Sequence, residues 1–313
     1  MDSYDGSESW QTYRALVEDQ FGVPIERTPA ETWRLVRAHD LHIDEWDPEG
    51  VAKGTLILVH GGGGNGRVLA PFADFAAGLG WRVLAPDLPG YGLTRPAPDY
   101  RWDYDEWPAI IAELADEADG PVVLMGLSVG GMTAAFAAEM ADKVRGVIAT
   151  TLLDMSDPTI FARSARWRLL GSLSLIGFKL MPWIIDRVAL PLRYAAPMHA
   201  MSDNKQMAEF FAHDPLLGGL WVPSRFFRTM HKRKVGRIET GCPVLLVHPG
   251  ADVWTPADLS LQALDQFEPP KDHVVLTNGS HLPLERPAID ELRDHVRHFL
   301  AAVETGSAMP AAG

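Results

Sequence analysis

The amino-acid sequence predicts an α/β protein in which a doubly wound, mostly parallel sheet carries an inserted helical cap. Short apolar runs alternate with segments of helical periodicity, and several runs end in turns rich in Gly or Asp, which predicts the sheet. The alternation stops at residue 154 and resumes only after 240, which predicts the insertion. A chain of 313 residues with 47% hydrophobic residues is long enough for such a domain with its cap.

The composition excludes several classes of protein. A formal net charge of −13 argues against nucleic acid as a partner of the whole molecule, since phosphate binding needs a basic surface. The single cysteine, Cys242, rules out an intramolecular disulfide framework, fits a reducing compartment, and precedes Pro243 as a small residue at a strand entrance. The N-terminus is acidic and polar, so we expect no secretory signal and a cytoplasmic protein.

The first 50 residues or so predict an extension ahead of the core. Residues 1–7 are polar and are expected to form a frayed tail. Residues 9–21 place apolar side chains at helical spacing, whereas residues 32–46 alternate in part between apolar and polar side chains. The extension is therefore expected to supply a helix and a pair of strands at the edge of the sheet.

The core is predicted in two parts, residues 1–153 and 241–313. Its first strand, residues 54–60, is apolar throughout, as expected of a strand covered by helices on both faces. The other expected elements are helix 68–79, strand 81–85, helix 107–118, a strand ending at Gly126, helix 132–140, strand 144–153, strand 243–247, helix 257–267, strand 273–276 and helix 287–303. Residues from about 304 to 313 are expected to be a disordered tail.

Residues 154–240 interrupt the alternation. The segment is rich in Trp and Phe and shows no strand pattern, and it is too long and too apolar for a loop, which predicts a helical cap or lid. Residues 169–190 are apolar enough to raise the question of a membrane span. Lys179 and Pro182 interrupt them, so no run of about 18 apolar residues exists. We expect a pair of cap helices that is buried or faces the substrate.

A turn with a serine at its apex follows one of the apolar runs. Residues 121–125 read Pro-Val-Val-Leu-Met and lead into Gly126-Leu-Ser-Val-Gly130, a G-x-S-x-G pattern that good helix formers follow. The glycines leave room for a sharp turn between strand and helix that exposes the central hydroxyl. Ser128 is therefore the candidate nucleophile.

A serine hydroxyl needs a base to take its proton and a group to orient that base. Asp252 and His281 each follow an expected strand of the second part of the core. Because the carboxyl ends of parallel strands meet at one edge of a sheet, Ser128, Asp252 and His281 are expected to converge. Their order along the chain is the one typical of a nucleophile on such a turn. Asp154, after the strand 144–153, is the alternative acid.

These motifs together resemble the α/β-hydrolase fold superfamily, in particular its capped serine esterases and lipases, over about residues 50–300. The resemblance rests on His60-Gly-Gly62, Asp87-Leu-Pro-Gly-Tyr-Gly92, the Ser128 turn, Pro249-Gly-Ala-Asp252, and Gly279-Ser-His281 followed by Glu285-Arg-Pro287. It implies a catalytic triad of Ser128, Asp252 and His281, and it makes His60 and Asp87 structural residues that support their turns.

The resemblance also implies an oxyanion hole. Its donors would be the backbone N–H groups of Val129, after the nucleophile, and of Gly62, in the first Gly-rich turn; Gly61 or Gly63 could replace Gly62. Such donors stabilise the negative charge that develops on the carbonyl oxygen under attack. A phosphate-binding loop is the rival interpretation of this turn, but Arg67 follows Gly66 where a G-x-x-x-x-G-K pattern requires Lys.

No metal or organic cofactor is expected. His295 and His298 have a spacing that could suggest a metal site, but no carboxylate or cysteine partner is placed near them, and solvent exposure explains them. The sequence therefore predicts a serine hydrolase that cleaves carboxylic esters with an apolar acyl or alcohol part through an acyl-enzyme intermediate. The alternatives are another triad reaction (hydrolysis of a C–C bond, lactone opening or perhydrolysis) and a non-catalytic ligand-binding scaffold.

The cap differs in charge from the rest of the chain. Residues 154–240 contain 13 Lys and Arg against 7 Asp and Glu, although the whole chain is acidic. Opposite charges can dock the cap onto the body. Alternatively, a basic, aromatic cap could receive amphiphilic or anionic small-molecule substrates, or make peripheral contact with an anionic membrane surface.

Overall fold

The computed structural model describes residues 3–307, and an eight-stranded sheet forms its centre, with the order β1-β2-β4-β3-β5-β6-β9-β10. Pairs from β4 to β10 are parallel, whereas β2 is antiparallel to both β1 and β4. The strands are β1 (Ala30–Val36), β2 (His39–Trp46), β3 (Thr55–Val59), β4 (Arg82–Pro86), β5 (Val122–Gly126), β6 (Val144–Ala149), β9 (Val244–His248) and β10 (Lys271–Val275). The predicted α/β fold and its edge strand pair are confirmed.

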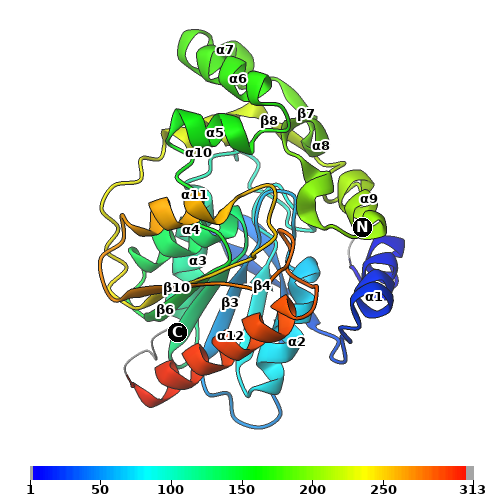
Figure 1. Ribbon diagram of the computed structural model, residues 1–313, viewed down its shortest axis with the longest axis vertical. Helices are drawn as coiled ribbons and strands as arrows, with labels where there is room; N and C mark the ends of the chain where they lie inside the picture. Colours follow the sequence, from blue (N-terminus) through cyan, green and yellow to red (C-terminus); the bar gives the residue numbers. More distant parts are fainter. Residues whose placement is uncertain (1–2, 308–313) are drawn as a thin grey trace.

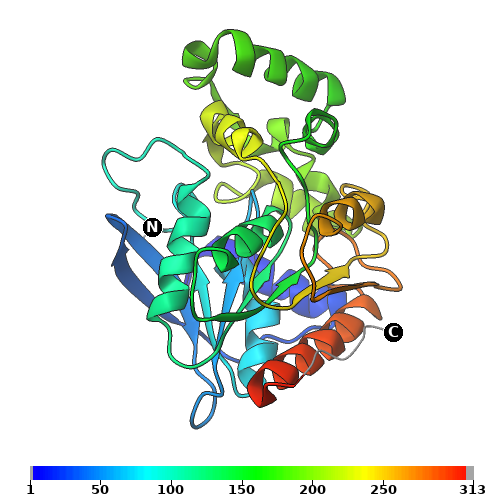
Figure 2. The same cartoon turned by 90° about the vertical axis from the view of Figure 1, so that its left-hand side faces the viewer.

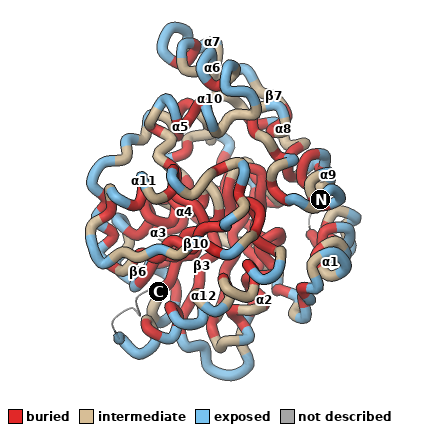
Figure 3. Tube along the Cα trace, viewed as in Figure 1, coloured by how far each residue is buried: buried red, intermediate tan, exposed pale blue. Residues whose placement is uncertain are grey.

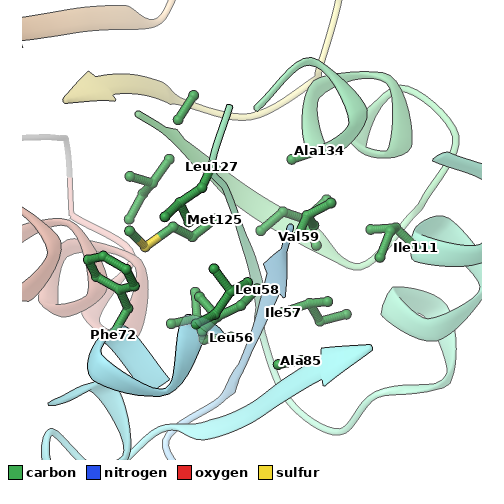
Figure 4. Close-up of a cluster of buried hydrophobic side chains, with 14 of the residues drawn as sticks. Leu56, Ile57, Leu58, Val59, Phe72, Ala85, Ile111, Met125, Leu127 and Ala134 are labelled. Carbon is green, nitrogen blue, oxygen red and sulfur yellow. The ribbon is translucent and has the colours of Figure 1, made fainter. Parts of the chain in front are cut away.

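Helices cover both faces of the sheet. Helices α2 (Ala70–Gly78) and α12 (Ala288–Thr305) contact each other on one face, and α3 (Glu106–Glu117) and α4 (Val129–Ala138) contact each other on the opposite face (Figure 1). The side chains of β3 alternate between the two layers: Leu56 and Leu58 point toward Phe72 of α2, whereas Ile57 and Val59 point toward Ile111 of α3 and Ala134 of α4 (Figure 4). All five residues of β3 are buried, because both faces are covered.

Several boundaries differ from the prediction. Strand β6 ends at Ala149, not at 153, because the chain turns at Thr150, whose N–H donates to Gly126 O. Helix α11 (Ala257–Leu264) is shorter than expected, and α12 reaches Thr305, inside the predicted tail. Residues 308–313 of that tail lie outside the described residues. The remaining core helices are α1 (Glu8–Phe21) and the 3-10 turn η1 (Arg67–Leu69).

The prediction of a frayed tail at the N-terminus is wrong for residues 3–7. Tyr4 is 2% exposed, and its hydroxyl donates a hydrogen bond to Asp87 Oδ2 at 2.8 Å. Ser7 then caps α1 by accepting the N–H of Trp10. The polar sequence suggested a tail because the carboxylate that Tyr4 binds is supplied by a distant turn. Residues 1–2 lie outside the described residues.

A buried arginine ties this N-terminal segment to the core. Arg67, which the sequence singled out only as the residue that breaks a phosphate-loop pattern, is 2% exposed. Its guanidinium donates to both carboxylate oxygens of Asp44 at 2.8 Å, to Glu31 at 2.9 Å and to Asp5 at 3.0 Å. Arg67 therefore fixes the loop after β3 to β1, β2 and the N-terminus, and its positive charge balances the buried carboxylates.

The inserted cap lies above the carboxyl edge of the sheet (Figures 1 and 2). Its elements are α5 (Pro158–Ser164), α6 (Arg168–Leu180), α7 (Pro182–Ile185), β7 (Ala189–Pro191), α8 (Leu192–Ala195), η2 (Met198–Met201), α9 (Lys205–His213), β8 (Trp221–Pro223) and α10 (Ser224–Lys232). The cap is mainly helical, as predicted, but β7 and β8 form a two-stranded sheet, and strands of only three residues leave no pattern in the sequence. The cap boundaries at 154 and 240 stay a prediction.

The expectation that residues 169–190 are buried or face the substrate is only partly right. Phe178 of α6 is buried, but the stripe formed by Leu169, Leu173, Ile176 and Leu180 is between 55% and 70% exposed. Figure 3 shows both buried and exposed stretches along α6. Helix α6 is apolar on two faces and only one of them packs inward, so its composition resembled that of a buried helix. Within residues 3–307, no helix combines the length and hydropathy needed to cross a bilayer.

Candidate active site

Ser128 lies in a strained turn between β5 and α4. Its backbone has φ 56° and ψ −132°, a conformation that is unfavourable for a residue with a side chain. The neighbouring glycines are required by close contacts: a Cβ on Gly126 would lie 2.0 Å from Gly130 O, and a Cβ on Gly130 would lie 2.1 Å from Val59 O. The G-x-S-x-G pattern thus folds into a turn that only this distribution of glycines allows.

A chain of hydrogen bonds links the three residues that the sequence singled out. Ser128 Oγ lies 2.8 Å from His281 Nε2, and His281 Nδ1 lies 2.7 Å from Asp252 Oδ2. An ionised carboxylate only accepts hydrogen bonds, so Nδ1 carries the imidazole proton and Nε2 is left to accept from the Ser128 hydroxyl. The geometry is that of a nucleophile beside a base and of a base beside an orienting acid.

The environment of Asp252 keeps it ionised. Burial alone would raise the pKa of its carboxyl, but the charge of His281 and the hydrogen bonds from His281 and Thr255 outweigh burial and lower the pKa to about 2. Its Oδ1 also accepts the backbone N–H groups of Trp254 and Thr255, each at 2.9 Å. The turn that begins at Asp252 therefore holds the carboxylate in place ahead of α11.

The alternative acid, Asp154, is engaged elsewhere. Its Oδ1 accepts hydrogen bonds from the backbone N–H and the hydroxyl of Ser156, at 2.9 Å and 2.7 Å. Among residues 3–307, no hydrogen bond joins Asp154 to His281. The imidazole of His281 forms hydrogen bonds with Asp252 and Ser128. The geometry therefore favours Asp252 as the partner of the histidine.

Two neighbours of Asp252 complete the site and were missed in the sequence. Thr255 Oγ1 donates to Asp252 Oδ2 at 2.5 Å and lies 3.3 Å from His281 Nδ1. The Trp254 ring lies beside the imidazole, with ring centroids 4.6 Å apart, and its Nε1 donates to Ser164 O of the cap. Their positions after Asp252 were visible, but the direction of each side chain depends on the turn, which the sequence pattern does not specify.

Two backbone donors near Ser128 are free. Within residues 3–307, neither Gly62 N–H nor Val129 N–H forms a hydrogen bond, and both residues border the same cavity as Ser128. Gly61 packs against the nucleophile turn, where an added Cβ would lie 2.7 Å from Ser128 Cβ, and Gly63 lies against Leu192 of the cap. Gly62 is therefore the glycine of this turn best placed to act with Val129 on an oxyanion.

An apolar cavity of about 110 Å³ extends from Ser128 into the cap. Its walls include Phe161 of α5, Leu170 and Phe178 of α6, and Phe226 and Met230 of α10. Among residues 3–307, no Lys, Arg, Asp or Glu borders it. The positive charge of the cap therefore does not face the cavity, and the cavity suits an uncharged, apolar group.

The other polar groups that the sequence raised support the structure. His60 is buried; its Nδ1 lies 2.8 Å from Gly61 O and its Nε2 accepts the N–H of Leu88. Asp87 accepts the N–H groups of Gly66 and Leu93, so it holds two turns together. Burial raises the pKa of the Cys242 thiol to about 11, which argues against a nucleophilic role.

One group of possible metal ligands was not anticipated. Glu31, His42 and Asp44 place their ligand atoms within 4.8 Å of one another. However, the guanidinium of Arg67 already binds Glu31 and Asp44 there, so a cation would have to displace a buried positive charge. His295 is half-buried and His298 is exposed on α12, and neither belongs to such a group within residues 3–307.

Comparisons with known proteins agree with this architecture. The alpha/beta hydrolase family matches residues 56–289, more than half of the chain. A pimeloyl-[acyl-carrier protein] methyl ester esterase of Xanthomonas axonopodis is 35% identical over 261 residues, covering 80% of this chain and 96% of the esterase. A 2-hydroxy-6-oxo-2,4-heptadienoate hydrolase of Pseudomonas putida is 26% identical, with 82% and 92% covered. The structure of a monoglyceride lipase from Saccharomyces cerevisiae has a TM-score of 0.71 at 15% identity, covering 89% of this chain and 96% of that one.

Proposed function

This chain belongs to the alpha/beta hydrolase family, and we propose that it is a serine hydrolase that cleaves carboxylic esters with an apolar acyl or alcohol part. The observation that carries the proposal is the hydrogen-bonded chain of Ser128, His281 and Asp252 at the end of an apolar cavity. A hydroxyl beside an oriented imidazole is the arrangement needed to attack an acyl carbon.

In the first half of the reaction, His281 Nε2 takes the proton of Ser128 while Oγ forms a bond to the ester carbonyl carbon. Gly62 N–H and Val129 N–H stabilise the resulting oxyanion, and the charge on His281 is balanced by the ionised Asp252. The tetrahedral intermediate then breaks its bond to the alcohol oxygen. His281 gives its proton to that oxygen, which leaves an acyl-enzyme on Ser128 and a free alcohol.

In the second half, water replaces the alcohol. His281 takes a proton from a water molecule while the water oxygen attacks the acyl carbon. The bond between the acyl carbon and Ser128 Oγ then breaks as His281 returns the proton to Oγ. The carboxylic acid leaves and the site is restored. No step needs a group other than the residues named and water.

Alternative reactions of charged substrates and the binding scaffold are less well supported. No Lys or Arg of the described residues 3–307 lies on the cavity walls, so a neutral ester fits better than a substrate with a carboxylate. A binding scaffold would not need free N–H groups on Gly62 and Val129 beside a hydroxyl that is bonded to a histidine. These contacts favour turnover of an uncharged acyl compound.

Covalent labelling tests the proposal. We expect an alkyl fluorophosphonate to modify the folded protein once, with the phosphorus bound to Ser128 Oγ after loss of fluoride, and peptide mass mapping to locate the adduct on Ser128. The rates at which a series of p-nitrophenyl esters is hydrolysed should then depend on the length of the acyl chain. An adduct on another residue, or no adduct in a folded sample, would overturn the serine hydrolase proposal.

We also propose that the outer face of the cap contacts an anionic lipid surface. Ten of the sixteen large apolar side chains that are exposed in residues 3–307 lie between residues 167 and 194. Helices α6 and α7, which fall within this range, lie at the end of the molecule away from the core (Figure 3). Residues 158–199 also contain six Arg and Lys but one acid, Asp186, which is paired with Arg225 and Arg228. A second copy of this face would repel it, whereas anionic lipids would bind both its apolar and its basic side chains.

Vesicle flotation tests this contact. Wild-type protein is expected to float with vesicles that contain phosphatidylglycerol. It is expected not to float with vesicles of pure phosphatidylcholine. Leu173→Glu, in the exposed stripe of α6, should release the protein, whereas Leu35→Glu should not, because Leu35 is 80% exposed on edge strand β1, outside the cap. Equal release by both variants, or no flotation of the wild type, would rule out a specific cap surface.

A further inference from the structure

A second, smaller cavity also borders Ser128. It has a volume of about 30 Å³ and lies beside Gly62 and His281, with Val68, Met201, Phe211 and Leu282 among its walls. The larger cavity borders Ser128 and Gly62 as well, but its walls do not include His281. The two cavities therefore meet at the nucleophile and differ in their access to the imidazole.

The position of the imidazole distinguishes the acyl part of an ester from its alcohol part. His281 must deliver a proton to the alcohol oxygen when the acyl-enzyme forms, so the alcohol leaves on the side of that histidine. We infer, on the basis of the proposed ester hydrolysis, that the large cavity holds the acyl part and the small cavity holds the alcohol. The substrate class is then an ester of a bulky apolar acid with an apolar alcohol of about one or two carbons.

The volumes support this size limit. A cavity of roughly 10–15 Å³ holds one water molecule, so the small cavity has room for about two or three non-hydrogen atoms. Methanol and ethanol are of that size. The larger cavity, at about 110 Å³, has room for several methylene groups along Leu170, Phe178 and Phe226.

The polar groups of the small cavity argue against an alcohol with further hydroxyls. Among residues 3–307, the polar side chains on its walls are His60, Ser128 and His281. Both ring nitrogens of His60 form hydrogen bonds, one with Gly61 O and one with Leu88 N–H. The side chains of Ser128 and His281 form a hydrogen bond with each other. Within residues 3–307, no further side chain of these walls is free to bond the additional hydroxyls of glycerol, which opposes binding of a glyceryl ester.

A series of esters of one acid tests the inference on the wild-type protein. With methyl, ethyl, n-butyl and 1-glyceryl octanoate, we expect kcat/KM for the methyl and ethyl esters to exceed the values for the other two by at least about tenfold. The acid is the same throughout, so differences report on the alcohol side alone. Liberated acid is measured by titration at constant pH.

Two matched variants separate the cavities. Met201→Ala widens the small cavity and is expected to raise the ratio of n-butyl to methyl ester kcat/KM, while Leu170→Ala widens the large cavity and should change acyl-length preference without changing that ratio. Thermal unfolding verifies that both variants are folded. Equal kcat/KM for glyceryl, n-butyl and methyl esters, with Ser128 still labelled by a fluorophosphonate, would overturn this inference alone. No hydrolysis together with no labelling would overturn the proposed function itself.

Discussion

Replacing Ser128 with alanine is expected to lower kcat for hydrolysis of a p-nitrophenyl ester by about 10⁴- to 10⁶-fold, with a much smaller change in KM. The variant lacks the oxygen that forms the acyl-enzyme, while the walls of the cavity and the free N–H groups of Gly62 and Val129 remain. Fluorophosphonate labelling should disappear as well. The small residual rate would come from binding and from these N–H donors.

A serine on the wall of the same cavity provides a matched control. Ser174, on α6, borders the large cavity, but its hydroxyl donates to Leu170 O and, within residues 3–307, forms no hydrogen bond with a base. Ser174→Ala should therefore leave kcat within a few-fold of the wild-type value. Both variants should keep the wild-type melting temperature to within a few degrees, because neither removes a buried apolar contact. Retained turnover in Ser128→Ala would mean that another group attacks the ester.

The sequence was sufficient to predict the convergence of distant residues because strand ends obey a general rule. Ser128, Asp252 and His281 each follow a strand of a parallel sheet, and the carboxyl ends of such strands share one edge. The requirement for glycines around Ser128 was equally predictable, since close backbone contacts exclude side chains there. The fold class and the residues to test thus follow from strand order and turn chemistry alone.

Other features depend on side-chain direction and on contacts between distant segments. The hydroxyl of Thr255 reaches Asp252 only because the turn after β9 points it inward. The burial of Tyr4 depends on Asp87, 83 residues away. The sequence did not distinguish the exposed stripe of α6 from the face that borders the cavity, because both faces are apolar.

Asp252→Asn is expected to lower kcat by about 10⁴-fold while leaving the fold intact. The wild-type carboxylate accepts the proton on His281 Nδ1 and so leaves Nε2 free to accept from Ser128. An asparagine can present its NH₂ group to Nδ1 instead, which shifts the imidazole proton to Nε2 and removes the base. Asparagine also carries no charge to balance the imidazolium that forms during attack.

The pH dependence of stability provides a second readout of the same residue. The folded-state pKa of Asp252, about 2, lies below the ordinary value for an aspartate. Its carboxylate therefore contributes stability that is fully present above the ordinary value and is lost as the pH falls toward 2. Urea unfolding at pH 7 and at pH 3 should show a smaller loss of stability on acidification in Asp252→Asn than in the wild type.

Asp154→Asn decides between the two acids because it makes the same chemical change at the competing position. Within the described residues 3–307, the Asp154 carboxylate accepts hydrogen bonds only from Ser156, and an asparagine oxygen can keep those bonds. We therefore expect kcat to stay within a few-fold of the wild-type value. If Asp154→Asn lost activity by orders of magnitude and Asp252→Asn did not, His281 would have to turn toward the end of β6 during catalysis. The hydrogen bond between His281 and Asp252 would then be a feature of the resting enzyme, and Asp154 would be the acid that orients the base.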